Sequence, residues 1–292
     1  MHFVLLLYYT IKDFYCKVLF FFFLVKFFFF LVSFVNLRYN NANERRFFMA
    51  NPILNDDRFS AQERILEGEP MTIQGTISKI FMLMVCLLAG AAISLYFLFG
   101  GNAAMVPALI SGSAIVGFLL VLATCFNIKL AKFTAAPYAL LEGICLGGIS
   151  ALVEAQFQGI VVQAILGTFA VLFVMLMLFK TKAIQYTEKF AAVLKTSLLS
   201  IVAIYLIQLV AMLFGRGIPG IFEAGFIGIA FSLFVIVIAA MSLIQDFAFI
   251  QMGEKNMLSK DYEWYGAMGL MITLVWLYLE ILRLLAKLNS RR

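Results

Sequence analysis

Several ionisable side chains of this sequence lie inside long apolar stretches, where chemistry with ions is the first thing to consider. Asp246 lies in IAAMSLIQDFAFIQMG and Glu142 lies in APYALLEGICLGG. The stretch from Trp264 to Lys287 carries Glu280 and Arg283. A charged side chain in lipid costs several kcal/mol, so it faces protein or water and often marks an ion pathway. Carboxylate oxygens are also the ligands that calcium prefers.

Both carboxylates also have structural interpretations, which the sequence leaves open. Glu142 could be a protonated glutamic acid that hydrogen-bonds a neighbouring helix, or part of an ion pathway. Asp246 could be a helix-end carboxylate in the headgroup region, held by Lys129 or Lys132. Alternatively, Asp246 is a proton-sensing group at the mouth of a pathway, with the two lysines as a latch.

An ion pair is expected farther along, toward the C-terminus. Glu280 and Arg283 are three residues apart, so they lie on one face of a helix and can pair directly. Glu154 and Glu223 are alternative partners for Arg283 on the same predicted side of the membrane. A structural salt bridge and a functional closing pair both fit this pattern.

The helix that must position these groups is the stretch Trp264–Lys287. About 20 apolar residues at ~1.5 Å rise per residue span a ~30 Å hydrocarbon core. Polar and aromatic side chains recur on one face of this helix: Thr273, Trp276, Glu280 and Arg283. Small residues at its start allow close helix packing: Gly266, Ala267 and Gly269. We therefore expect this stretch to be the central helix of a bundle.

Composition sets the class of protein. Of 292 residues, 64% are hydrophobic and 13% are charged, whereas soluble domains are about half apolar and about a quarter charged. The chain is therefore predicted to be an all-α, polytopic membrane protein whose partner is the lipid bilayer. Its net charge of +6 comes mostly from short loops, which indicates topology signals and not nucleic-acid binding.

The chain lacks the residue patterns of an enzyme or a metal site. His2 is the one histidine, which excludes a histidine-based zinc site or catalytic triad. The four cysteines lie in apolar segments without metal-ligand spacing. We expect no cofactor, no certain metal site and no catalysis, with calcium at most a transported ion.

Seven apolar segments predict a seven-transmembrane-helix bundle with the last helix at its centre. Connecting loops are short, as in a compact bundle. Gly143 and Gly147 form GxxxG in the third segment, a pattern that favours helix association. The predicted spans are Lys79–Phe99, Met105–Phe126, Thr134–Ala155, Gly159–Phe179, Ala191–Phe214, Gly225–Phe249 and Trp264–Ala286.

Two different segments precede the bundle at residues 79–292. Residues 1–48 are rich in phenylalanine and are either an extra membrane anchor or signal sequence, or translated upstream sequence. We expect the mature protein to begin at Met49, because codons for Glu44-Arg45-Arg46 can contain a bacterial ribosome-binding site. Residues 49–78 are polar and predict an aqueous arm, with Ser60 as a helix N-cap.

Lysines and arginines set the predicted orientation. The arm and the even-numbered connections hold most of them, including Lys182 and Lys260, whereas the other side holds Arg216, Lys287, Arg291 and Arg292. The positive-inside rule therefore predicts that the N-terminus lies in the cytoplasm and the C-terminus outside.

Four long stretches, in order, resemble the bacterial Bax inhibitor (YccA-like) family, which is related to the transmembrane Bax inhibitor motif proteins. The resemblance covers the chain from about Asn51 to the C-terminus. The stretches are NPILNDDRF, APYALLEGICLGGISALVEAQFQGIVVQA, FSLFVIVIAAMSLIQDFAFI and EWYGAMGLMITLVWLYLEILRLLAKL.

The resemblance implies a seven-helix fold with the last helix wrapped by six others, and a pH-sensitive calcium leak. It also implies that two hydrogen-bonded aspartates, on the sixth and seventh helices, gate such a leak. Asp246 matches the first, and Arg283 matches the arginine of the final helix. The position of the second aspartate is occupied here by Thr273, which is a departure from the family's pattern. Glu142 is predicted to lie at a depth in the membrane similar to that of Thr273, and it could supply the second carboxylate from the third helix.

A second function is also implied. Other members of the family are similar in binding and restraining a membrane-bound quality-control protease, which needs no ion pathway. In that case the polar arm Ala50–Thr72 would contact the protease or a stress-response partner. The sequence therefore supports two hypotheses: an ion leak and a non-transporting membrane regulator.

Overall fold

The computed structural model describes residues 69–100, 105–214, 218, 220–221 and 223–291. The expectations for the phenylalanine-rich segment, the start at Met49, the arm before residue 69 and the helical turn after Ser60 lie outside these residues. Seven helices of the described part are long and apolar enough to cross a membrane, which confirms the predicted class of fold. They are α3 (Ile73–Phe99), α4 (Val106–Phe126), α5 (Ala131–Glu154, preceded by the 3-10 turn η2, Ile128–Leu130), α6 (Ile160–Lys180), α7 (Glu188–Leu213), α8 (Phe226–Lys255) and α9 (Asp261–Asn289).

Helix α3, the first helix that the structure describes, starts earlier than its apolar segment does. Thr72 has an extended backbone, and its Oγ1 accepts a hydrogen bond from the backbone N–H of Gly75 at 2.9 Å. This is an N-cap, which satisfies one of the backbone donors that every helix start leaves free. Residues 73–78 are therefore helical, although the hydropathy pattern placed them in the polar arm. Hydropathy reports the membrane-facing part of a helix and not its hydrogen-bonded ends.

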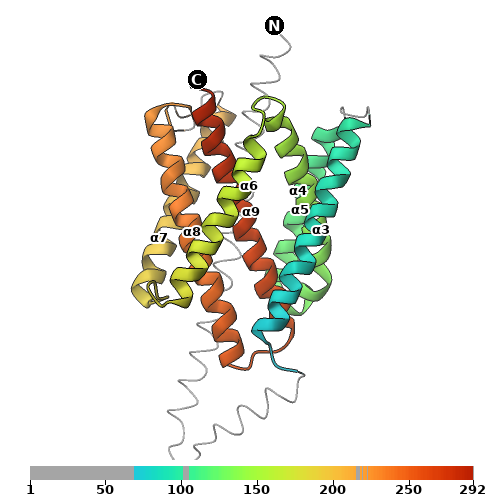
Figure 1. Ribbon diagram of the computed structural model, residues 1–292, viewed down its shortest axis with the longest axis vertical. Coiled ribbons are helices and arrows are strands. Elements are labelled where there is room, and N and C mark those ends of the chain that lie inside the picture. The colour runs from blue at the N-terminus through green and yellow to red at the C-terminus, as the bar shows by residue number, and fades with distance from the viewer. Residues whose placement is uncertain (1–68, 101–104, 215–217, 219, 222, 292) are drawn as a thin grey trace, which may run out of the picture.

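Helix α9 lies between two halves of the bundle (Figure 1). One side of α9, including Met268, Met271 and Val275, belongs to an apolar core shared with α3, α4 and α5. Its other side, including Leu274 and Leu277, belongs to a second core shared with α6, α7 and α8. Helix α9 contacts α3, α5, α6 and α8, while α4 packs against α5 and α7 against α8. The last helix is central, as predicted.

Small residues bring α3 and α5 into backbone contact. A Cβ built on Gly143 would lie 1.9 Å from the carbonyl oxygen of Leu87, and one on Gly90 would lie 2.0 Å from that of Leu140. Gly147 meets the backbone of Ala91 in the same way, at 2.7 Å. The GxxxG pattern therefore serves close packing of these two helices, because any side chain would separate them.

The helices alternate in direction, so that the bundle has two distinct ends (Figure 1). One end holds the start of α3 and the α4–α5, α6–α7 and α8–α9 connections; we call it the α8–α9 end. The other holds the α5–α6 connection and the C-terminus; we call it the C-terminal end. The basic connections of the sequence, with Lys129, Lys182 and Lys260, gather at the α8–α9 end.

Candidate functional site

The structure brings Asp246 of α8 and Thr273 of α9 together inside the bundle. The hydroxyl of Thr273 donates a hydrogen bond to Oδ2 of Asp246, and the two residues are 8% and 0% exposed. Asp246 precedes the last residue of α8, Lys255, by nine positions, which is ~14 Å along a helix axis. Asp246 therefore lies in a buried contact between two helices.

The hydroxyl of Thr273 also lies 3.1 Å from the carbonyl oxygen of Gly269, one turn earlier in α9. A hydroxyl has one hydrogen, so it favours one of these two acceptors at a time. When Asp246 is ionised, its carboxylate accepts the hydrogen bond from the Thr273 hydroxyl. A protonated Asp246 can instead donate to the Thr273 oxygen while the hydroxyl turns to Gly269. The contact therefore has two hydrogen-bonded arrangements that differ by one proton.

The two lysines that the sequence offered as partners of Asp246 lie elsewhere. Nζ of Lys132 is 4.0 Å from Oδ1 of Asp261, at the start of α9, and lies over the ring of Phe133. Lys129 is exposed on the η2 turn. Both lysines lie at the α8–α9 end of the bundle, as their positions in the sequence predicted. The rotation of η2 and α5 about their axes turns them toward the surface and the α8–α9 connection, and not toward Asp246.

Glu142 is buried on the other side of the bundle, in α5. It is 3% exposed, and the polar groups that interact with it are Tyr138 and Cys145 of its own helix. The Tyr138 hydroxyl lies close enough to the Glu142 carboxyl group to interact with it, but neither the hydroxyl nor Oε1 makes a hydrogen bond of standard geometry within the described residues. Buried polar atoms without a well-formed hydrogen bond are costly in a dry interior.

Two residues near Asp246 carried no signal in the sequence analysis. Tyr186, in the α6–α7 connection, has its pKa raised by burial and, to a smaller extent, by the negative charge of Asp246. The α6–α7 connection therefore approaches Asp246 from the α8–α9 end. Gln245 is buried beside Asp246 in α8, and its Oε1 makes no hydrogen bond within the described part of the chain. A polar residue next to a candidate carboxylate is the pattern that could have identified Gln245.

The predicted pair of Glu280 and Arg283 forms in α9, and Tyr205 of α7 completes it. The Tyr205 hydroxyl donates to Oε1 of Glu280 at 3.0 Å, and Nη1 of Arg283 lies 3.4 Å from Oε2 of Glu280. Nη1 of Arg283 also donates to the Tyr205 hydroxyl, and its guanidinium carbon lies 5.4 Å from the centre of the tyrosine ring. A buried ion pair is tolerated when hydrogen bonds satisfy its remaining atoms. These three residues form what we call the Glu280 cluster.

Glu154, the alternative partner of Arg283, caps another helix. Its Oε1 accepts from the backbone N–H of Gly159 at 2.5 Å and its Oε2 from that of Val161 at 3.0 Å. These groups lie at the start of α6, where unpaired backbone N–H groups and the helix dipole favour a carboxylate. Gly159 has a φ of +79°, a left-handed conformation that glycine adopts easily and that folds the short α5–α6 connection back onto Glu154.

Lys287 was expected in a basic tail but is buried at the end of α9. Its Nζ donates to the carbonyl oxygen of Gly228 at 2.8 Å and to Oγ of Ser232 at 2.9 Å, and it reaches the carbonyl oxygen of Ile221 at 3.4 Å. It thus connects α9 to α8 and to the segment before it. Because Lys287 is held internally, the exposed positive charge at the C-terminal end is smaller than a count of basic residues suggests.

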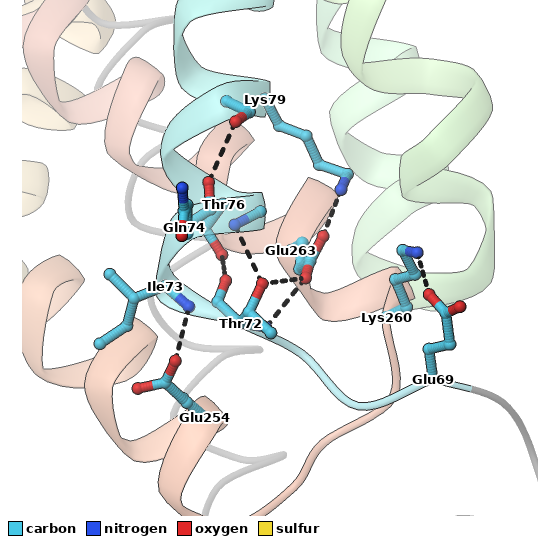
Figure 2. Close-up of polar contacts among 11 residues, drawn as sticks. Glu69, Thr72, Ile73, Gln74, Thr76, Lys79, Glu254, Lys260 and Glu263 are labelled. Atoms are coloured by element: carbon cyan, nitrogen blue, oxygen red, sulfur yellow. Dashed lines mark hydrogen bonds and ion pairs between the residues drawn. The ribbon is translucent and has the colours of Figure 1, made fainter.

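At the α8–α9 end, a buried carboxylate connects the first and last helices (Figure 2). Oε1 of Glu263, in the first turn of α9, accepts from the backbone N–H of Thr72 at 2.9 Å and from its hydroxyl at 3.0 Å. Oε2 of Glu263 accepts from Nζ of Lys79. Glu263 is 1% exposed. We call Thr72, Lys79 and Glu263 the Glu263 clasp.

Backbone contacts extend this clasp along the α8–α9 connection. Met71 donates to the carbonyl oxygen of Leu258 at 2.7 Å, and Lys260 donates to that of Glu69 at 3.0 Å. The N–H of Ile73 donates to Oε1 of Glu254 at 3.0 Å (Figure 2). The sequence analysis missed the clasp, because Glu263 lies among the charged residues of a loop and its partners are about 190 positions away along the chain.

Comparison with known proteins identifies a family. A family model described as Bax inhibitor 1 like matches residues 51–290. No curated protein and no solved structure matches the chain. Within the residues that the structure describes, no three His, Cys, Asp or Glu side chains gather closely enough to hold a metal ion.

Proposed function

Because the chain belongs to the Bax inhibitor 1 like family and is a multi-pass membrane protein, we propose that it is a pH-sensitive cation leak that passes calcium through the bundle. The observation that carries this proposal is the hydrogen bond between Asp246 and Thr273. It joins α8 to the central helix at a buried position, where a change of one proton alters the contact between two helices.

The direction of the pH response follows from the chemistry of that bond. A hydrogen bond to a charged group contributes ~1.5–3 kcal/mol, and one between neutral groups ~1 kcal/mol. The ionised form of Asp246 therefore holds α8 against α9 more strongly than the protonated form does. Since Thr273 carries no charge of its own, we expect protonation to loosen the contact and the leak to increase as the pH falls.

Other polar groups are assigned to the same pathway. Glu142 supplies a second carboxylate from α5, since its buried Oε1 has no hydrogen-bond partner in the described part of the chain. Arg283 and Glu280 close the C-terminal end, because their charges and the Tyr205 hydroxyl satisfy one another there. Calcium is the transported ion in this scheme, and the carboxylates are its transient ligands.

The proposed location is the bacterial inner membrane, with the α8–α9 end in the cytoplasm. The basic connections at that end support it through the positive-inside rule. The burial of Lys287 adds support, because it removes a free positive charge from the opposite end. No reaction is proposed: the polar groups pair with one another as structural and ion-binding groups.

Calcium flux into liposomes that contain the purified protein tests the leak. Wild type is compared with Asp246→Asn over a pH series from about 5.5 to 8. Glu280→Gln is the comparison variant: Glu280 is also a buried carboxylate, but it belongs to the proposed closure at the C-terminal end and not to the sensor. Its replacement can change the size of the flux in this scheme, so only the pH dependence is compared. We expect flux that rises toward low pH in the wild type and in Glu280→Gln, and a flat response in Asp246→Asn. An unchanged response in Asp246→Asn would remove this residue from the mechanism.

A second candidate function is restraint of a membrane-bound quality-control protease. One observation favours it: the clasp fixes Glu69–Thr72 at the α8–α9 end, so the preceding arm is attached beside the α8–α9 connection. Deletion of residues 50–68, which leaves the clasp intact, should abolish binding of such a protease and leave the leak unchanged. Absence of wild-type flux at every pH would favour this function over the leak.

A further inference from the structure

A groove lies on the side of the bundle between α3 and α6, and nothing in the proposed leak uses it. Its volume is about 740 Å³, within the usual range of ~300–1,000 Å³ for sites that bind small molecules. Side chains of α5 and α9 form its floor, among them Leu146, Ala151, Met271 and Val275. Almost all of the lining is aliphatic or aromatic.

The walls of the groove face the membrane. Leu88 of α3 and Val162 and Phe169 of α6 line it and are 61%, 59% and 51% exposed. Both helices have the length and hydropathy of membrane spans. The molecules that reach this groove from the side are therefore lipids, and an acyl chain matches its apolar lining.

Polar groups lie toward the C-terminal end of the groove. Oγ of Ser150 and the hydroxyl of Tyr278 are 2.6 Å apart. Two hydroxyls carry two hydrogens, and their mutual bond uses one. The other is available for an acceptor in the groove, such as the ester carbonyl of a lipid. The pair therefore offers one donor at the edge of an apolar surface.

Charge distinguishes between headgroups. Glu154 follows Ser150 by one helical turn and also lines the groove, near the exposed Gln158. No lysine or arginine is among the lining residues that the structure describes. Both oxygens of Glu154 accept from backbone N–H groups at the start of α6, and each carboxylate oxygen can accept a further hydrogen bond. An ammonium headgroup can therefore donate to Glu154, whereas a purely anionic headgroup meets no lysine or arginine among the described lining residues.

We propose that this groove is a binding site for a phospholipid with a free ammonium headgroup, of the phosphatidylethanolamine class. One acyl chain lies along α5 and α9 between α3 and α6. The Ser150–Tyr278 pair donates to an ester carbonyl, and the ammonium lies beside Glu154. The proposal is independent of the leak, since it uses neither Asp246 nor Thr273.

Native mass spectrometry of the protein in detergent tests the site, with phosphatidylethanolamine and phosphatidylglycerol of identical acyl chains supplied in equal amounts. Ala151→Phe fills the floor of the groove. Val162→Trp fills it from an exposed wall position that does not enter the core. Ala170→Phe is the matched control, on an exposed position of α6 that does not line the groove. The melting temperature of each variant shows whether it is folded.

We expect the wild type and Ala170→Phe to retain phosphatidylethanolamine in preference to phosphatidylglycerol, and both filling variants to lose it. Ser150→Ala combined with Tyr278→Phe should weaken retention by about five-fold, the effect of one hydrogen bond. Retention by folded Val162→Trp equal to that of Ala170→Phe would overturn the site. Equal retention of the two lipids by the wild type, or of neither, would overturn the headgroup assignment.

Discussion

A side chain on residue 75 would overlap the carboxylate of Glu263, because a Cβ built on Gly75 lies 2.4 Å from Oε1. Glycine at this position lets α3 and α9 approach closely enough for Glu263 to reach both Thr72 and Lys79. The N-cap of the first helix, the buried carboxylate and the glycine therefore form one unit.

The first prediction follows from this contact. Gly75→Ala should lower the free energy of unfolding by about 1–3 kcal/mol, because the carboxylate must move and its buried hydrogen bonds are lost. Gly112→Ala is the control: Gly112 is also helical and exposed, and a Cβ there meets no atom within 4 Å. That variant should be neutral or slightly stabilising. Thermal unfolding in detergent measures both, and equal melting temperatures would contradict the contact.

The Lys79–Glu263 pair should show strong coupling. Their side chains are 15% and 2% exposed, and removal of one partner of a buried pair typically costs ~3–5 kcal/mol, since the other charge stays buried. We therefore expect Glu263→Gln and Lys79→Met each to destabilise strongly, and the double variant to be less destabilised than their sum. Additive effects would show that the pair does not interact.

The exposed pair Glu69–Lys260 is the control for that cycle, and its pH response has a defined sign. Lys260 lowers the pKa of Glu69 through a hydrogen bond and its charge, and the pair in turn raises the pKa of Lys260. Because the pKa of Glu69 is lower in the folded state than its unfolded-state value of ~4.3, the pair stabilises the fold at pH values above ~4.3. This stabilisation is lost as the pH falls through the folded-state pKa of Glu69. Because both groups are exposed, Glu69→Gln should not measurably change stability at neutral pH.

The contact between α3 and α5 gives a third prediction. Gly143→Ala should destabilise by about 3 kcal/mol or more, because its Cβ would meet the backbone oxygen of Leu87, which cannot rotate away. Unfolding in detergent measures the effect, again with Gly112→Ala as control. A melting temperature like that of the wild type would mean that these helices are farther apart.

Thr273→Val tests the hydrogen bond without removing the carboxylate. The variant keeps the shape of the side chain but has no donor for Asp246, so the closed contact of α8 and α9 loses ~1.5–3 kcal/mol. We expect calcium flux near pH 8 to rise by about ten-fold or more, with a smaller further increase at low pH. Ser242→Ala is the control, since this buried hydroxyl donates to the carbonyl oxygen of Ile238 in its own helix and has no hydrogen bond to another helix among the described residues. Equal flux in the two variants would separate Thr273 from the pathway.

Topology gives the last prediction. Seven crossings place the α6–α7 connection and the end of α9 on opposite sides of the membrane. Single cysteines at the exposed positions Gln185 and Ser290, in a background without native cysteines, should react with an impermeant reagent from opposite sides, Gln185 from the cytoplasm. Labelling of both from one side would show that a span is miscounted.

The sequence by itself determined the membrane spans and the place of the last helix. A helix satisfies its backbone hydrogen bonds within its own segment, so hydropathy and length are sufficient to identify it in a membrane. The small and polar residues of α9 are unfavourable against lipid, so they predict that other helices surround α9 without identifying which helices these are. The pair of Glu280 and Arg283 was predictable for the same reason, since both partners lie on one helix.

Only the tertiary structure decided which residues the other polar groups meet. Glu154 caps α6 and does not join Arg283, Lys132 approaches Asp261 and not Asp246, and Lys287 enters the bundle instead of the solvent. Each outcome depends on the rotation of one helix against another, which side-chain packing over the whole bundle sets. A residue's depth along its own helix is encoded locally; the direction in which it faces a distant segment is not.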